Sequence, residues 1–211
     1  MLPRPRAVLS APLLLLCLAT PALLPAAAQD LADAGTEAVA SGGLAGWQPG
    51  PGQPLDMARF MGRWYVVARV PHPVERGHVA STLDYRLAGS ERVDIDYRYR
   101  DGVDGQARLL PLRARTDGDS GHRRWRTWYY RVLPSRTSVL EVAQDYSWAL
   151  VGQRGGAMAW ILARDVQMSQ EQYHGLGERL AAHGYNTDRM RRVVHSADQV
   201  GRLGFETPPR P

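Results

Sequence analysis

The sequence predicts an all-β domain of eight antiparallel strands, with a short helical turn before them and one α-helix after them. Two observations support this prediction. Between residues 64 and 163, runs of about eight residues alternate between apolar and polar side chains, which is the period of a strand with one buried face. Short turn signals separate the runs, so consecutive strands are expected to lie antiparallel. This pattern fits either a sandwich or a barrel.

The first 28 residues have the pattern of a secretory signal peptide. Arg4 and Arg6 precede an apolar run that proline interrupts, and residues 26–28 are small enough for cleavage by a signal peptidase. The run is shorter than the roughly 20 apolar residues of a membrane span. We therefore expect export with cleavage after Ala28. Acylation of Cys17, the one cysteine, is the less favoured alternative, because apolar sequence continues past it.

The rest of the chain divides into three parts. Residues 29–54 are rich in Ala, Gly, Asp and Pro and predict a flexible leader. The folded domain is expected over 55–196, and 197–211 as a loosely ordered tail. Without Arg4 and Arg6, the 26 basic residues become 24 against 21 acidic ones, a net charge of +3. The arginines are scattered along the chain, so nucleic acid is not an expected partner.

The strand pattern is clearest in the third run, where Val93, Ile95, Tyr97 and Tyr99 alternate with charged residues. In the fourth run Pro111 cannot donate a ladder hydrogen bond, which indicates an edge or a bulge. The strands are expected at 64–70, 79–87, 93–100, 106–115, 123–133, 138–146, 148–153 and 157–163, with a short ninth strand at 191–195.

Caps and turns mark the remaining elements. Asp56 can cap a helical turn that ends at Gly62. Ser169 is followed three residues later by glutamine, the pattern of a capping box, and Gly184 is a suitable stop for the helix that begins there. The turn between the fifth and sixth strands is predicted at residues 134–135, a Pro-Ser pair.

Three motifs resemble those of the lipocalin family and occur in the family's order. Gly62 and Trp64 form the opening Gly-x-Trp pattern, Asp145 and Tyr146 resemble the Thr-Asp-Tyr segment, and Arg164 stands where lipocalins carry an arginine after the last barrel strand. The resemblance covers about residues 55–195. It implies an eight-stranded antiparallel up-and-down β-barrel with the C-terminal helix packed on it. It also implies that Trp64 lies at the closed end, beneath Arg164.

Shorter segments are similar to the bacterial outer-membrane branch of the family, the relatives of apolipoprotein D. These segments are 75–77, 149–151 and 160–162. Gln144 departs from the family by replacing the threonine of its motif, and the segment around Pro111 does not follow the family either. These departures concern the shape of the pocket rather than the fold.

The resemblance implies binding and storage or transport of a small hydrophobic ligand, a fatty acid or a lysophospholipid, in the bacterial envelope. The protein is expected in the periplasm or at the periplasmic face of the outer membrane, as a monomer or a dimer. Association with a membrane surface is left open. A barrel of this size has room for one small ligand. Six residues are expected near that ligand, with simple core filling as the alternative for each: Trp64, Tyr97, Tyr99, Tyr129, Met158 and Trp160.

Motifs of catalysis are missing from the sequence: there is no Gly-x-Ser-x-Gly, no His-Glu-x-x-His and no phosphate loop. The histidines lack the spacing of metal ligands, so we expect no catalytic residue, metal or cofactor. Arg98 or Arg126 could neutralise an acyl carboxylate or a phosphate at the barrel mouth, although we favour the alternative that both are exposed to solvent. Two alternatives to a carrier remain: a structural or interaction module with a filled barrel, and an isomerase-type enzyme acting on a bound lipid.

Overall fold

The computed structural model describes residues 53–130 and 132–208. The predicted signal peptide, Cys17 and nearly all of the predicted leader lie outside these residues. No helix in the described ranges is long and apolar enough to cross a membrane. The elements are α1 (Met57–Phe60), β1 (Gly62–Arg69), β2 (His78–Leu87), β3 (Arg92–Asp101), β4 (Ala107–Thr116), η1 (Gly118–Ser120), β5 (Arg124–Tyr129), β6 (Leu133–Val142), β7 (Trp148–Gln153), β8 (Ala159–Ala163), α2 (Gln170–Ala182), β9 (Arg191–Arg192) and η2 (Ala197–Gln199).

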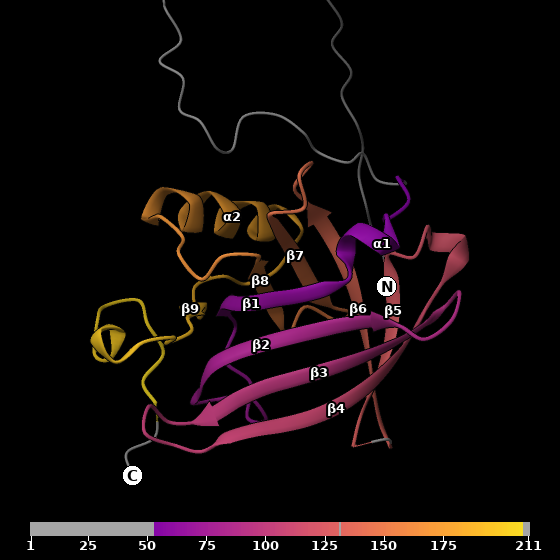
Figure 1. Ribbon diagram of the computed structural model, residues 1–211. Helices are drawn as coiled ribbons and strands as arrows, with labels where there is room; N and C mark the ends of the chain where they lie inside the picture. The colour runs from indigo at the N-terminus through magenta and orange to yellow at the C-terminus, as the bar shows by residue number, and fades with distance from the viewer. Residues whose placement is uncertain (1–52, 131, 209–211) are drawn as a thin grey trace, which may run out of the picture. The chain divides into compact units, whose positions relative to one another are not determined.

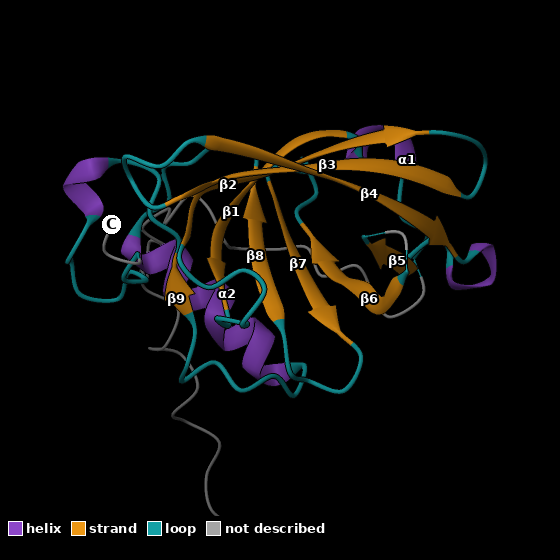
Figure 2. Ribbon diagram, turned by 90° about the horizontal axis from the view of Figure 1, so that it is seen from below, coloured by secondary structure: helices purple, strands orange, loops and turns teal. Residues whose placement is uncertain are grey.

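Eight antiparallel strands form a closed barrel, as the sequence and the family resemblance predict. From β2 to β8 each strand pairs with its neighbours in the sequence, and β1 pairs with both β8 and β2, which closes the ring. The strands curve around a common interior (Figure 2). The short strand β9 adds to β1 at Ala68 and Arg69. The pairing of β1 with β2 therefore decides between the barrel and the sandwich.

The alternation of the third run corresponds to an inner and an outer face. Val93, Ile95 and Tyr97 of β3 are buried in the barrel core. Arg98, between them and the strand end, points outward and pairs with carboxylates on β2 and β3 at 3.1 and 3.3 Å. Arg126 is likewise exposed on the outer side of β5. Neither arginine lines the barrel interior, so the hypothesis that they neutralise a ligand head group at the mouth does not hold.

Two prolines show where local prediction succeeds and fails. Pro111 lies within β4 and pairs with β3, while β4 pairs with β5 only from Arg113 onward. The proline thus lies in a half of β4 that has one partner strand, as its missing N–H requires. Pro134 does not mark a turn: β5 ends at Tyr129, β6 begins at Leu133, and Pro134 is a strand residue opposite Trp128. Here strand pairing overrides the turn preference of proline.

The helix α2 packs on the outside of the barrel beside β7 and β8 (Figure 1). Leu176 and Leu180 on its inner face are fully buried among residues of β7 and β8. A polar contact adds to this packing, because the buried carboxylate of Glu141 on β6 accepts hydrogen bonds from Arg179 at 2.6 Å and His183 at 2.8 Å. The helix therefore covers the outer face of the sheet and leaves the barrel interior free.

Candidate functional site

One end of the barrel is closed by α1 and Arg164. The chain turns from α1 into β1 at Gly62, whose φ of +91° favours glycine. The Arg164 guanidinium donates to four carbonyl oxygens between residues 59 and 63, at 2.6 to 3.2 Å. It also lies 3.8 Å from the ring centroid of Trp64, which is fully buried. One side chain thus fastens the end of α1 over the barrel.

The second motif supports the same end. Tyr146 accepts a hydrogen bond at its hydroxyl from the backbone N–H of Asp56, 2.9 Å away, and Arg59 lies 4.3 Å from its ring centroid. Asp145 accepts bonds from the backbone N–H and the hydroxyl of Ser147 at 3.0 and 2.6 Å, which fixes the loop before β7. In this structure the motif residues hold the closed end together and are not among the residues that line the cavity.

The barrel interior contains a narrow, mainly apolar cavity. The space that the centre of a water molecule can reach in it is about 60 Å³. A volume counted in this way leaves out a layer about 1.4 Å thick along the walls, so the cavity is a slot rather than a wide chamber. It is lined by Phe60, Val66, Glu75, Leu83, Tyr85, Ile95, Tyr97, Leu112, Trp125, Thr127, Tyr129, Thr137, Val139, Val151, Trp160 and Leu162.

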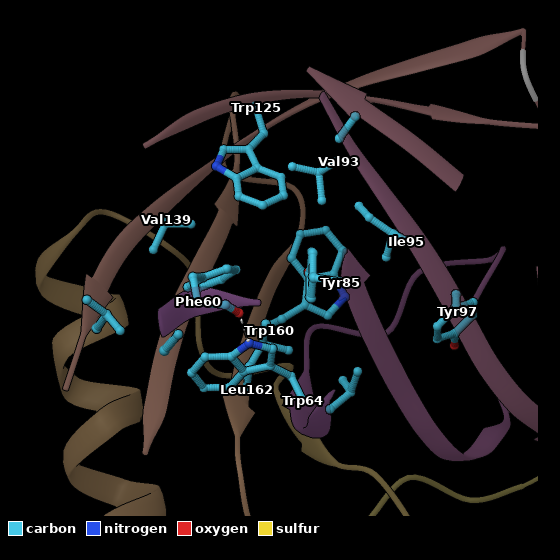
Figure 3. Close-up of a cluster of buried hydrophobic side chains, with 14 of the residues drawn as sticks. Phe60, Trp64, Tyr85, Val93, Ile95, Tyr97, Trp125, Val139, Trp160 and Leu162 are labelled. Atoms are coloured by element: carbon cyan, nitrogen blue, oxygen red, sulfur yellow. Dashed lines mark hydrogen bonds between the residues drawn. The ribbon is translucent and has the colours of Figure 1, made fainter. Parts of the chain in front are cut away.

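Aromatic rings near the closed end narrow the slot. Phe60 from α1, Tyr85 from β2 and Trp125 from β5 point toward one another in the interior (Figure 3). Their ring centroids are 5.4 to 5.6 Å apart, and all three pairs pack edge to face. These are favourable aromatic contacts, so the rings form a fixed floor to the cavity.

The structure divides the six expected ligand residues into two groups. Tyr97, Tyr129 and Trp160 line the cavity together. The other three do not: Trp64 lies at the closed end beneath Arg164, Tyr99 stacks on His78 with centroids 3.6 Å apart, and Met158 is a core residue outside the lining. Alternation identifies the inward face of a strand, but the height of a residue along the barrel decides whether it meets the cavity.

At the opposite end of the barrel, Glu75 reaches into the cavity from the loop between β1 and β2. It is 7% exposed, and its carboxylate accepts a hydrogen bond from the indole N–H of Trp160 at 2.9 Å. Trp160 pairs with Arg69, the last residue of β1, so this contact lies near the mouth. The sequence drew attention to residues 75–77 only as a family match, and nothing in it indicated that the carboxylate enters the barrel.

Beside Glu75's loop lies a fully buried arginine that sequence reasoning missed. The Arg69 guanidinium is 0% exposed and pairs with Glu206 at 2.7 Å. The other oxygen of Glu206 accepts a hydrogen bond from the backbone N–H of Gly77, 3.0 Å away. Part of the segment predicted to be a loose tail therefore returns to the barrel and holds the loop between β1 and β2.

His78 completes the polar cluster at the mouth. Its Nδ1 lies 3.0 Å from the hydroxyl of Tyr97. Burial and the nearby charge of Arg69 lower the pKa of His78 to about 4, although Asp101 acts in the opposite direction. The imidazole is therefore neutral at pH 7.

The tyrosines around the cavity are also neutral at pH 7. Burial raises the pKa of the Tyr85, Tyr97 and Tyr129 hydroxyls, and the charge of Glu75 raises all three further. Glu75 lines the same cavity as all three phenols, which accounts for its influence on each of them. The cavity therefore presents neutral phenols and one carboxylate.

Comparison with known families and proteins identifies relatives over most of the chain. A family model described as a lipocalin-like domain matches residues 55–195. Temperature-induced lipocalin-1 of Arabidopsis thaliana is 26% identical over 149 residues, which cover 67% of this chain and 80% of the plant protein. The outer membrane lipoprotein Blc of Vibrio cholerae is 22% identical over 141 residues, which cover 66% of this chain and 82% of that protein.

Solved structures share the fold at low sequence identity. Lobster apocrustacyanin A1 superimposes with a TM-score of 0.55 at 16% identity, over 68% of this chain and 81% of that one. Insecticyanin from the tobacco hornworm Manduca sexta gives a TM-score of 0.55 at 16% identity, over 70% of this chain and 85% of the insect protein. At this identity the likeness concerns the fold alone.

Proposed function

Because the chain belongs to the lipocalin-like domain family, we propose that it binds an amphiphile with one long unbranched chain, a fatty acid or a lysophospholipid, and stores or transports it. The observation that carries the proposal is the narrow slot that leads from Glu75 at the mouth to the aromatic floor. Each methylene buried there contributes about 0.8 kcal/mol, so a chain of about twelve carbons gains about 10 kcal/mol before the costs of ordering. The burial of an alkyl chain therefore supplies enough free energy for binding, without any chemical step.

The width of the cavity favours a slender ligand. The centre of a water molecule can reach a space of about 60 Å³ in the cavity. A cavity this narrow suits an extended alkyl chain. A planar ring system would require the floor rings Phe60, Tyr85 and Trp125 to separate, and their mutual packing opposes this. The same narrowness favours the second candidate, a structural module whose barrel is filled by its own side chains.

We propose that the protein acts in the bacterial cell envelope, as a member of the outer-membrane branch of the family. The N-terminal sequence supports export, and the Vibrio cholerae relative is named as an outer membrane lipoprotein. We propose binding without catalysis; among the residues that the structure describes, the cavity lining contains a single carboxylate.

Thr127 allows a direct test of the cavity. Its side chain is buried and lines the slot from β5. Thr127→Trp fills the slot, whereas Thr127→Val keeps its shape and serves as the matched control. Binding of a long-chain ligand, followed by tryptophan emission and by native mass spectrometry of the purified protein, should be lost in the first variant and kept in the second. A filled barrel would instead show no stoichiometric ligand in any of the three proteins.

A further inference from the structure

The described cavity lining has one acidic side chain and no basic partner for it. In the described part of the chain, Glu75 is the one lining residue with an ionisable carboxylate, and the lining holds no arginine or histidine. The Glu75 carboxylate receives a single hydrogen bond from these residues, at Oε2 from the Trp160 indole, and forms no ion pair with them. Buried carboxylates are normally paired with a cation, because burial without a partner is costly. The free oxygen therefore marks a place for a ligand group.

The two basic groups nearest the mouth do not supply this partner. Arg69 is already matched by Glu206 at 2.7 Å, and its remaining contacts go to the His78 carbonyl and to two hydroxyls. The imidazole of His78 lies against Tyr97 and Tyr99 and is neutral at pH 7. Neither basic group therefore pairs with Glu75.

Aromatic side chains line the same cavity as Glu75. Tyr97, Tyr129 and Trp160 line the cavity together with Glu75. The face of an aromatic ring attracts cations, most strongly when water is excluded, and a carboxylate among aromatic rings is the chemistry that recognises an ammonium group. An anionic head group would meet repulsion from Glu75 and find no free cation among the described lining residues.

We infer that Glu75, positioned by Trp160, forms a subsite for an ammonium group, so that the cavity selects an amphiphile with a positively charged head over one with a carboxylate. This inference rests on the proposed function. Within that function it favours a lysophospholipid with a zwitterionic head, whose ammonium group offsets its phosphate and can pair with Glu75, over a fatty acid, whose head carries only negative charge. The alkyl chain lies along the slot toward Phe60 and Leu162, with the ammonium group at the mouth.

Three probes with the same ten-carbon chain test the inference: decyltrimethylammonium, decanol and decanoate, each below its micelle concentration. Their dissociation constants are measured by calorimetry at pH 7 for the purified full-length protein, for Glu75→Gln and for Glu178→Gln. The last variant is the matched control, because Glu178 is an exposed residue on α2. We expect the ammonium probe to bind at least tenfold more tightly than decanoate, about 1.4 kcal/mol.

The variants then assign the preference to the subsite. Glu75→Gln should weaken the ammonium probe about tenfold, strengthen decanoate and leave decanol nearly unchanged, while Glu178→Gln changes none of the three. Equal or tighter binding of decanoate by the unaltered protein overturns the inference but supports the proposed function. An unchanged ratio of the two ions in Glu75→Gln also overturns it. Failure of all three probes to bind, decanol included, overturns the proposed function itself.

Discussion

Glu206→Gln tests whether the C-terminal segment is anchored to the barrel. In the structure the carboxylate of Glu206 neutralises Arg69, which is completely buried, and accepts a hydrogen bond from the backbone of Gly77. The substitution keeps the size of the side chain and removes its charge. The positive charge of Arg69 then remains in the interior without a partner.

The magnitude follows from the burial of this pair. Removing one partner of a buried ion pair costs about 3–5 kcal/mol, because the other charge is left unpaired. Glutamine can still accept a hydrogen bond, and Arg69 keeps the carbonyl of His78 at 2.9 Å, so we expect the lower end, about 3 kcal/mol. With a denaturant slope of about 2 kcal/mol per molar urea, the unfolding midpoint should fall by about 1.5 M.

Urea unfolding followed by tryptophan emission measures this shift. The matched control is Asp198→Asn, which breaks the ion pair of Asp198 with Arg202 in the same segment. Both side chains of that pair are exposed, so its loss should cost less than about 0.5 kcal/mol. Amide exchange at Gly77 should accelerate in Glu206→Gln alone. If Glu206→Gln lowers the midpoint no more than the control does, the buried pair does not anchor the segment.

Three further predictions concern other parts of the barrel. Arg164→Met removes the hydrogen bonds to the α1 carbonyls and the contact with the Trp64 ring. The free energy of unfolding, measured in urea, should fall by about 2–4 kcal/mol. A fall of less than about 1 kcal/mol would contradict the role given to this arginine. Glu141→Gln weakens the attachment of α2 and should expose that helix to limited proteolysis before the barrel unfolds; simultaneous cleavage would argue against a separate attachment. Since the pKa of His78 is lowered from 6.5 to about 4 in the folded state, the unfolded chain binds the proton more readily, so stability is complete above about pH 6.5 and is lost as the pH falls toward 4. His78→Phe, which keeps an aromatic ring, should reduce this dependence in pH-resolved unfolding, and an unchanged slope would assign it to other groups.

Local patterns in the sequence determined most of the elements, although not the turn between β5 and β6, and the face that β3 buries. Val93, Ile95 and Tyr97 could be placed inside because side chains alternate strictly along a strand. The capping box at Ser169 could be predicted because its two hydrogen bonds join residues three positions apart. Such features depend on neighbours in the chain and therefore need no knowledge of the fold. The family motifs added the barrel and its closed end.

Only the tertiary structure decided which inward residues meet the cavity and which charges remain unpaired. Arg69 and Glu206 are 137 positions apart, and Glu75 and Trp160 are 85 apart. No periodicity or turn signal links residues at such separations, because their contact depends on how the barrel closes and where its loops and tail return. Whether a charged residue has a partner is likewise decided by these contacts. Arg69 is paired with Glu206, whereas Glu75 has no basic residue beside it in the described cavity lining.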